Sequence, residues 1–345
     1  MREESIFDKY DLLDVDEKFP IPELPESGLI LVVGTSGSGK STILSNWFNT
    51  APRVIKDGSI IDQFSSHEQG ERLLIASGLR TIPAWRRSAS ELSNGERHRF
   101  EIALALDCGD EFIDEFSSVV DRDTAKSLSF SIQRHFKDSK MLRLVIATCH
   151  RDVEEWLDPD YVYDTDQQQW KESSLFPRGL LRRPKIKVNI RAVEAKDFWP
   201  VFKKYHYLSG KLNASAQAFC AFMGEKPIAF CAILRFPNGN FKNAWREHRT
   251  VVLAEFQGLG LGKAISETIG DLILESGGRF FSKTSHPAFV HFRNKSDKWK
   301  ATTKNGKSRA DYLITKTKTK EDGHKDNHSH RLCGSHEYIG KLTQC

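Results

Sequence analysis

The stretch "GLILVVGTSGSGKSTIL", residues 28–44, joins an apolar strand to a helix through a run of small residues. It fits the pattern G-x-x-x-x-G-K-[ST] in the strand–loop–helix order that this pattern requires. The glycines let backbone N–H groups point inward around phosphate oxygens, and the helix N-terminus adds partial positive charge. We expect Lys40 to reach the β- and γ-phosphates of a nucleotide and Ser41 to ligate Mg²⁺. The predicted nucleotide site comprises Gly34, Thr35, Ser36, Gly37, Ser38, Gly39, Lys40 and Ser41.

A second glycine-rich turn, "VVLAEFQGLGLGKAISETIG" at residues 251–270, also leads from a strand into a helix. It lacks the Gly-Lys-Ser/Thr ending, and the spacing of its glycines does not fit the dinucleotide pattern G-x-G-x-x-G. It does fit Gln/Arg-x-x-Gly-x-Gly/Ala through Gln257, Gly260 and Gly262. Backbone amides at a helix N-terminus again predict a diphosphate ligand, different from the first.

The net charge of +5 conceals opposite charges in the two halves of the chain. Residues 1–175 contain 20 Lys and Arg against 32 Asp and Glu, a net charge of −12, whereas residues 176–345 contain 31 against 14, a net charge of +17. The basic half favours a polyanionic partner such as nucleic acid, although a solvated basic surface or docking on the acidic half would also explain it. The 345 residues leave room for two domains.

The sequence predicts neither a membrane span nor a signal peptide. No window approaches 18 uninterrupted apolar residues, and the N-terminal stretch "MREESIFDKYDLLD" is polar. The six cysteines are scattered, and none forms a Cys-x-x-Cys pair. Reduced, buried thiols in a cytoplasmic protein are the simplest interpretation.

Further polar motifs follow the first loop, each beside an apolar stretch. An acidic pair ends the apolar run in "EFIDEF", residues 111–116, where it can hold Mg²⁺ and polarise a water. The segment "LSNGE", residues 92–96, precedes a helical pattern, and alone it could equally be a serine N-cap with a glutamate three residues later, a capping box. The residues singled out are Gln63, Ser93, Gly95, Asp114, Glu115 and His150.

This set resembles the nucleotide-binding domain of ABC-type ATPases, with five motifs in the family order over about 120 residues. In that family ATP is held between two protomers, and the phosphate loop of one faces the signature serine and glycine of the other. The resemblance implies an ATP-dependent homodimer in which Glu115 polarises the attacking water and His150 contacts the γ-phosphate. It also implies Mg²⁺ held by Ser41, Gln63 and Asp114.

Two departures from the family pattern matter. The signature reads Leu-Ser-Asn-Gly-Glu instead of Leu-Ser-Gly-Gly-Gln, and Asn94 tolerates unusual backbone angles. About 50 residues separate Lys40 from the signature, roughly half the spacing in ABC transporters. The short insert and the lack of a predicted membrane span indicate the soluble ABC ATPases, many of which act on DNA, RNA or ribosomes.

The second glycine loop resembles the coenzyme-A pyrophosphate site of GNAT-fold acyltransferases. Around it, strand, helix, hairpin, long strand, loop, helix, strand and helix follow in the order of that fold over about 150 residues. The resemblance implies that acetyl-CoA or another acyl-CoA binds here. The residues implied are Gln257, Gly258, Leu259, Gly260, Leu261, Gly262 and Lys263.

The two resemblances predict an α/β chain of two domains, similar to uncommon fusions of an ABC-type ATPase with an acetyltransferase domain. We expect an N-terminal P-loop ABC-type ATPase domain over residues 1–165 and a GNAT-fold α+β acyltransferase domain over residues 188–345. A polar, proline-containing linker over residues 166–187 separates them, where the sign of the charge also changes.

The catalytic residues of the second domain carry a weaker signal. Acyl transfer needs a neutral acceptor amine, so a base must take its proton. Glu255 is the best-placed carboxylate and His286 could lie near the thioester, but surface charge and helix capping explain them equally well. Tyr205, His206 and Tyr207 lie where the family lines its acceptor site and could stack a base, or they cover the core.

The C-terminal tail carries a cluster of histidines, but no pair has clean zinc-ligand spacing. We expect a final strand in "RLCGSHEYIG" and a strand with one basic face in "TKTKTKED". The cluster is His324, His328, His330, Cys333 and His336.

Together these patterns predict an ATP-hydrolysing, acyl-CoA-dependent N-acyltransferase that modifies a base in DNA or RNA. Two alternatives stay open. One is an acetyltransferase that acts on a protein or a small amine, and the other is a nucleic-acid-binding ABC ATPase whose GNAT domain is inactive. The sequence does not identify the acceptor, the acyl group or the pathway.

Overall fold

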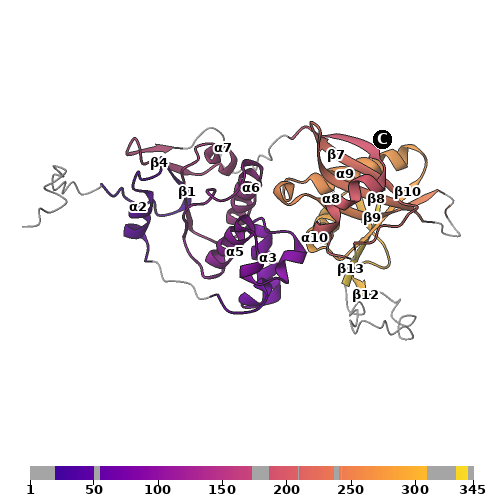
Figure 1. Ribbon diagram of the computed structural model, residues 1–345, viewed down its shortest axis with the longest axis horizontal. Coiled ribbons are helices and arrows are strands. Elements are labelled where there is room, and N and C mark those ends of the chain that lie inside the picture. Colours follow the sequence, from indigo (N-terminus) through magenta and orange to yellow (C-terminus); the bar gives the residue numbers. More distant parts are fainter. Residues whose placement is uncertain are drawn as a thin grey trace, which may run out of the picture.

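The computed structural model contains two separate sheets, one of five strands and one of eight. Each sheet forms the centre of a domain, and Figure 1 shows the two domains side by side. The structure describes residues 20–49, 55–172, 186–208, 210–236, 241, 243–308 and 332–340. The predicted basic strand "TKTKTKED" and the first three histidines of the tail lie outside these residues.

The first domain has a sheet with strand order β2-β3-β1-β4-β5, in which β5 runs antiparallel to β4 and the other neighbours are parallel. The first glycine loop leaves the carboxyl end of the central strand β1 and enters α2. Asp114 follows β2 and His150 follows β3, so both lie at the same edge of the sheet as this loop. The elements are β1 (Gly28–Val33), α2 (Lys40–Trp47), η1 (Ile60–Gln63), α3 (His67–Ala76), α4 (Ile82–Trp85), η2 (Ala89–Glu91), α5 (Asn94–Asp107), β2 (Phe112–Ile113), α6 (Arg122–Asp138), β3 (Arg143–Thr148), α7 (Val153–Leu157), β4 (Tyr161–Asp164) and β5 (Gln169–Glu172).

Alternate residues of β1 enter two different hydrophobic clusters, as the side-chain alternation of a buried strand requires. One face contributes Leu31 to the larger cluster, which also contains Phe100 of α5 and Leu128 of α6. The other face contributes Val32 to a smaller cluster with Ile43 of α2. The sheet is therefore covered on both sides, and its carboxyl edge is left for ligands.

The predicted linker begins too early. Residues 169–172 form β5, which pairs with β4 from Tyr161↔Glu172 to Asp164↔Gln169. The physical reason is Trp170, whose ring stacks on Trp47 with ring centroids 6.4 Å apart and packs against Tyr163 at 5.1 Å. One large aromatic side chain in a polar stretch thus extends the first sheet past residue 165.

The second domain has the strand order β11-β13-β10-β9-β8-β7-β6, with β12 also paired to β13. All neighbours are antiparallel except β9 and β10. The elements are β6 (Asn189–Val193), α8 (Ala195–Phe202), η3 (Lys203–Tyr205), β7 (Gln217–Met223), β8 (Lys226–Arg235), β9 (Ala244–Val252), η4 (Ala254–Phe256), α9 (Leu261–Glu275), β10 (Arg279–Thr284), α10 (Pro287–Lys295), β11 (Trp299–Ala301), β12 (Lys307–Ser308) and β13 (Leu332–Tyr338).

The parallel pair β9 and β10 positions the second glycine loop. The two strands pair only over residues 244–246 and 279–281, although β9 continues to Val252 and β10 to Thr284. Beyond these pairs the strands separate, and the glycine loop follows one of them while His286 follows the other. These two sheet topologies confirm the fold class expected from the sequence.

The two domains touch through the helices that flank the first sheet. In Figure 1, α3, α5 and α6 lie on the side of the first domain that faces the second. The Ser127 hydroxyl on α6 donates a hydrogen bond to the Gln257 carbonyl oxygen. The Arg80 side chain, between α3 and α4, lies against Gly258. Among the described residues, no helix combines the length and the apolar character needed to cross a membrane.

Candidate functional site

The first glycine loop has the geometry of a phosphate cradle. Gly37 and Gly39 have φ values of 81° and 89°, in the left-handed region that glycine favours. The N-cap of α2 is Gly39, which has no side chain to bond the first amides of the helix. These amides are therefore left for a ligand. Lys40 is buried, and its Nζ donates to the carbonyl oxygens of Gly34 at 2.9 Å and Thr35 at 2.6 Å. The ammonium group therefore lies over the loop.

Two of the three predicted magnesium ligands are in direct contact. Ser41 Oγ donates to Asp114 Oδ2 at 2.8 Å. The third, Gln63, is bonded to its own segment, since its Nε2 donates to the Lys56 carbonyl oxygen at 3.0 Å and its Oε1 accepts from Lys56 N at 2.9 Å. A hydroxyl and one carboxylate suit Mg²⁺, which keeps several waters and takes further ligands from substrate phosphates. The residues present therefore fit a nucleotide-bound Mg²⁺.

Glu115 and His150 lie beside this pair. Glu115 has a φ of 49°, and its carboxylate accepts a hydrogen bond from the Ser118 hydroxyl. His150 Nδ1 lies 2.8 Å from the Ser117 hydroxyl, which in turn lies 2.7 Å from Thr148 Oγ1. These bonds fix the imidazole through Nδ1, so Nε2 is the nitrogen that could contact a phosphate.

The predicted signature forms the N-terminus of α5. Ser93 is the N-cap, and both hydrogen bonds of a capping box join it to Glu96. Arg87 holds the same glutamate through an ion pair of 2.7 Å. The capping interpretation of "LSNGE" is thus correct for the single chain. It leaves the signature interpretation open, because a helix N-terminus also attracts phosphate.

Sequence reasoning missed the residues that hold the start of the phosphate loop. The Asp166 carboxylate accepts hydrogen bonds from Thr35 N at 3.1 Å and Thr35 Oγ1 at 2.7 Å, and Arg151 pairs with it at 2.8 Å. The hydrogen bond from the Thr35 hydroxyl is the main cause that lowers the pKa of Asp166. The only sequence signal was the pair of aspartates in "YDTD", residues 163–166, where the predicted linker begins.

The second glycine loop is a similar cradle. Gly258 and Gly260 have φ values of 94° and 85°. Gly260 is the N-cap of α9 and has no side chain to bond the first amides of that helix. Gln257 Nε2 donates to the Val252 carbonyl oxygen at 2.9 Å, which fixes the entry to the loop. A Cβ on Gly262 would lie 2.9 Å from the Phe289 ring, so only glycine lets α9 and α10 approach this closely. Lys263, also predicted for this site, stacks its ammonium group 4.2 Å from the centroid of the Phe292 ring.

A large groove of about 1980 Å³ runs past this loop. Residues of both domains line it, among them the predicted acceptor residues Tyr205, His206 and Tyr207 and the predicted catalytic residue His286. Three buried polar atoms around the loop have no hydrogen-bond partner in the described part of the chain: Gln257 Oε1, His286 Nδ1 and Arg80 Nε. Unpartnered buried donors and acceptors beside an amide cradle fit a site that a polar, phosphorylated ligand completes.

Two of the predicted acceptor residues, His206 and Tyr207, form an aromatic cluster with His286. The rings of His206 and Tyr207 stack with centroids 5.0 Å apart, and Tyr207 meets His286 edge-on at 5.8 Å. The Tyr207 hydroxyl lies 3.1 Å from Thr284 Oγ1 and accepts from Ser285 N at 3.3 Å. Burial lowers the pKa of His206 and of His286 to about 4, so both imidazoles are neutral at pH 7.

Glu255 lies elsewhere. It is on η4, where Lys226 pairs with it at 3.3 Å, and it does not line the groove. A different carboxylate, Glu247 on β9, is buried against Arg293 at 2.7 Å. Burial would raise the pKa of Glu247, but Arg293 and neighbouring hydroxyl groups outweigh it and lower the pKa. The structure therefore brings His286 to the groove and leaves Glu255 outside it.

Comparison with known proteins finds similar structures for both domains. No protein-family model and no curated protein matches the chain. The IAA acetyltransferase from Bacillus cereus is 13% identical, covering 44% of this chain and 99% of its own, with a TM-score of 0.34. The ribosomal-protein-S18-alanine N-acetyltransferase from Escherichia coli is 15% identical, covering 46% and 97%, with a TM-score of 0.32. A bacterial ABC transporter cassette in its dimeric form is 16% identical, covering 45% and 89%, with a TM-score of 0.35.

Proposed function

We propose that this chain is an ATP-hydrolysing, acyl-CoA-dependent N-acyltransferase that modifies a base in DNA or RNA. The observation that carries the proposal is the presence of two separate amide cradles, each at the N-terminus of a helix and each capped by a glycine with positive φ. Only one of them is followed by the lysine and serine that nucleotide hydrolysis uses, so the two cradles take different phosphorylated ligands.

In the first domain, the chain supplies the parts of a phosphoryl-transfer site. The loop amides and Lys40 would bind the nucleotide phosphates, and Ser41 with Asp114 would hold a Mg²⁺ that neutralises their charge. Glu115 orients the attacking water, and His150 contacts the γ-phosphate. Since the signature residues Ser93 and Gly95 form the N-terminus of α5, a second copy of the chain could present them to this nucleotide.

In the second domain, the glycine loop orients acyl-CoA, which supplies the activated thioester. A bond forms between the acceptor nitrogen and the acyl carbon, the carbon–sulfur bond breaks, and the thiolate leaves and takes up a proton. His286 is neutral at pH 7 with Nδ1 unpartnered among the described residues, so in the tautomer that carries its proton on Nε2 this nitrogen can accept the amine proton. The Tyr207 hydroxyl, in the same cluster, could donate the proton that the leaving thiolate takes up.

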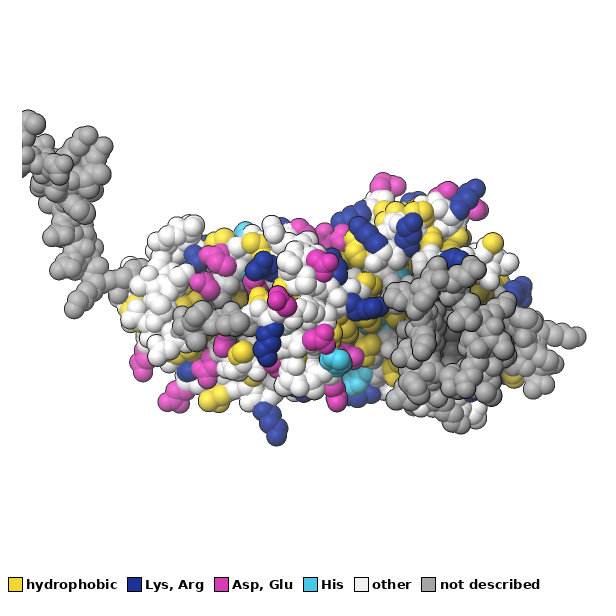
Figure 2. Space-filling view, turned by 60° about the horizontal axis from the view of Figure 1, so that its bottom comes forward, with side chains coloured by type: hydrophobic (Ala, Val, Ile, Leu, Met, Phe, Trp, Pro, Cys, Tyr) yellow, Lys and Arg dark blue, Asp and Glu magenta, His cyan; other side chains and the backbone are white. Residues whose placement is uncertain are grey.

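A nucleic-acid acceptor is favoured by charge and by the aromatic cluster. The second half of the chain carries a net charge of +17. Figure 2 shows acidic side chains spread over the first domain, with Lys and Arg side chains on the described part of the second. Lys203 and Lys204 are exposed next to the stacked rings of His206 and Tyr207. Cations beside stacked aromatic rings suit a phosphate backbone with an extruded base.

The test is acyl transfer from radiolabelled acetyl-CoA, with ATP and Mg²⁺, to duplex DNA, single-stranded DNA, RNA, a basic protein and a polyamine. The proposal expects label on a nucleic acid, identified by mass spectrometry of the nucleosides. The Gly260→Asp variant should abolish labelling, because the new carboxylate enters the diphosphate cradle at a backbone position with a φ of 85°.

Two other outcomes support the two alternatives. Label on the protein or the polyamine alone would support an acyltransferase whose acceptor is a protein or a small amine. ATP hydrolysis stimulated by nucleic acid, with no binding of acetyl-CoA, would leave a nucleic-acid-binding ATPase with an inactive second domain. A wild-type protein that neither hydrolyses ATP nor binds acetyl-CoA would contradict the proposal altogether.

A further inference from the structure

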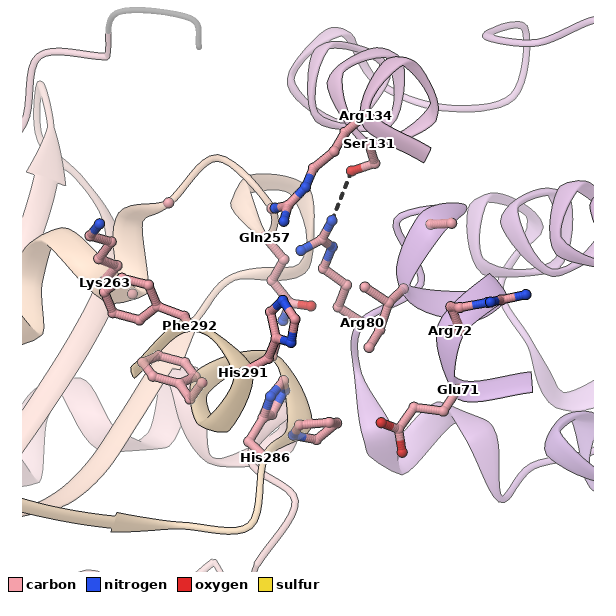
Figure 3. Close-up of a pocket in the computed structure, with 18 of the residues that line it drawn as sticks. Glu71, Arg72, Arg80, Ser131, Arg134, Gln257, Lys263, His286, His291 and Phe292 are labelled. Atoms are coloured by element: carbon pink, nitrogen blue, oxygen red, sulfur yellow. Dashed lines mark hydrogen bonds between the residues drawn. The ribbon is translucent and has the colours of Figure 1, made fainter. Parts of the chain in front are cut away.

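Arg80 belongs to the first domain, but its side chain ends at the second glycine loop. The residue lies between α3 and α4. A Cβ built on Gly258 would lie 3.1 Å from Arg80 Cζ, so the guanidinium packs on the loop backbone itself. Figure 3 shows Arg80 extending from the helices of the first domain toward Gln257, with Arg134 of α6 beside it. A cation from the ATPase half therefore forms part of the wall of the acyl-CoA cradle.

The guanidinium of Arg80 has few partners. Its Nη2 donates to Ser131 Oγ at 3.1 Å, whereas Nε is buried without a hydrogen-bond partner among the described residues. In that part of the chain no carboxylate lies within ion-pair distance of it. Burial, and then the nearby Arg134, lower its pKa to about 10, so Arg80 is still charged at pH 7. A half-buried cation without an anion is unfavourable, and a bound anion would remove this cost.

The anion is identified by what else lies around Arg80. Gln257, whose side chain fixes the entry to the glycine loop, lines the same groove as Arg80. The amides of residues 258–262 at the start of α9 favour phosphate in particular. The N–H groups of an arginine guanidinium and the amides of a helix N-terminus together suit a diphosphate, because its oxygens can accept hydrogen bonds from both.

We propose that the acyl-CoA site is shared between the domains, and that Arg80 of the ATPase half is a ligand of the coenzyme-A diphosphate. This inference rests on the proposed acyltransferase function. Ser131 of α6 orients the guanidinium, and Ser127 of the same helix bonds to the Gln257 carbonyl oxygen at the start of the loop. The coenzyme thus joins the two domains, and the second domain alone lacks part of its binding site.

The test is calorimetric binding of coenzyme A, dephospho-coenzyme A and pantetheine to the full chain. We expect Arg80→Gln to weaken binding of both coenzymes roughly 10- to 100-fold, because both contain the diphosphate. Pantetheine lacks the diphosphate and should bind both proteins equally. The matched control is Arg72→Gln. Arg72 is an exposed arginine that lines the same groove and bonds to Gln69 at 2.7 Å, and its loss should leave both affinities within twofold of wild type.

The outcomes separate this inference from the proposed function. If the wild type binds no coenzyme, both are wrong. If the wild type binds and Arg80→Gln binds equally well, the shared site is wrong and the acyltransferase stands. A loss for coenzyme A but not for dephospho-coenzyme A would place Arg80 at the 3′-phosphate and overturn the diphosphate assignment. The Arg80→Lys variant keeps the charge, so an intermediate affinity with unchanged thermal melting excludes misfolding as the cause.

Discussion

At the scale of single residues, Glu115 combines an unusual backbone with a position at the end of β2. A φ of 49° costs a non-glycine residue on the order of 1 kcal/mol, and such strain persists mainly where the surroundings impose it. Glu115 N is held by the Asp114 carboxylate at 2.8 Å, and its own carboxylate is held by the Ser118 hydroxyl. The strained backbone therefore places a second carboxylate directly after Asp114, the proposed magnesium ligand.

We expect Glu115→Gln to slow ATP hydrolysis roughly 100-fold or more, because the amide cannot polarise the attacking water. ATP binding should persist, so the variant should accumulate as an ATP-bound dimer. Phosphate release and sedimentation velocity measure the two effects. Glu101→Gln, an exposed glutamate paired with Arg97 at 3.1 Å, is the control and should behave like wild type. A Glu115→Gln protein that stays monomeric in the presence of ATP would contradict a nucleotide site shared by two protomers.

His286 makes stability depend on pH. Burial, and then Arg80 and Arg293, lower its folded pKa to about 4, against an ordinary value of 6.5. Between these values the unfolded chain binds more protons, so the free energy of unfolding is highest above about pH 6.5 and falls as the pH drops toward 4. We expect His286→Gln to remove on the order of 1–3 kcal/mol of this pH dependence.

Urea unfolding at about pH 7 and about pH 4.5 measures the effect of His286. His67→Gln is the control, because His67 has an exposed side chain and bonds only to Asp62 among the described residues, so its loss should leave the pH dependence as in wild type. Equal pH dependence in wild type and His286→Gln would show that this imidazole is not kept neutral by the fold. His206 has a similarly lowered pKa and should supply part of the remaining dependence.

At the scale of elements, the sequence predicts best what is local. Each glycine cradle lies between a strand and a helix that adjoin it in the chain, so composition and spacing suffice to place it. The hairpin and the last helix expected around the second glycine loop form β7 with β8 and α10. The stretch around Pro200 forms α8, which ends at Phe202 and continues as the short helix η3.

Contacts between distant elements could not be predicted in this way. Arg80 and Gly258 are far apart in the sequence and meet only because α3 and α6 pack toward the second domain. The ion pair of Glu255 with Lys226 depends in the same way on β8 lying beside the turn that follows β9. Spacing along the chain contains no signal for such pairs: no motif surrounds Arg80, and the hairpin turn that contains Lys226 does not indicate a contact with Glu255.

The helix α6 joins the two sites. It follows Asp114 and Glu115 of the proposed nucleotide site in the chain, and its Ser127 and Ser131 bond to the second glycine loop and to Arg80. We expect nucleotide binding to change the affinity for coenzyme A by a factor of roughly 5 to 150, with the reciprocal effect on nucleotide affinity. Ser127→Ala should bring this factor toward 1, because it removes the hydrogen bond between α6 and the loop.

Titrations of coenzyme A in the presence and absence of ATP, in the hydrolysis-deficient Glu115→Gln background, measure this coupling. The matched control is Ser129→Ala, whose hydroxyl bonds to the Ala125 carbonyl oxygen within α6 at 2.8 Å, and it should keep the wild-type factor. Equal coupling in the Ser127→Ala and Ser129→Ala proteins would show that the signal does not pass through the α6–loop bond.

At the scale of the whole molecule, the charge division predicts that the affinity for nucleic acid depends on salt concentration. Each lysine–phosphate contact on duplex DNA contributes about −0.9 to the slope of log affinity against log salt. Lys203 and Lys204 are exposed beside the acceptor cluster, and the Lys204 ammonium lies 4.8 Å from the centroid of the Tyr205 ring. If both lysines contact phosphates, the double variant Lys203→Glu, Lys204→Glu should reduce the steepness of that slope by about 2.

Fluorescence anisotropy with duplex DNA and with RNA between roughly 50 and 200 mM salt gives these slopes. The control is Lys56→Glu with Lys137→Glu, two exposed lysines of the acidic first domain, which makes the same change in net charge. Because the local position of the charges and not their sum determines counterion release, the control should keep the wild-type slope. Equal slopes for the two double variants would reduce the role of the basic half to a general electrostatic attraction, whereas an affinity independent of salt would remove nucleic acid as the partner.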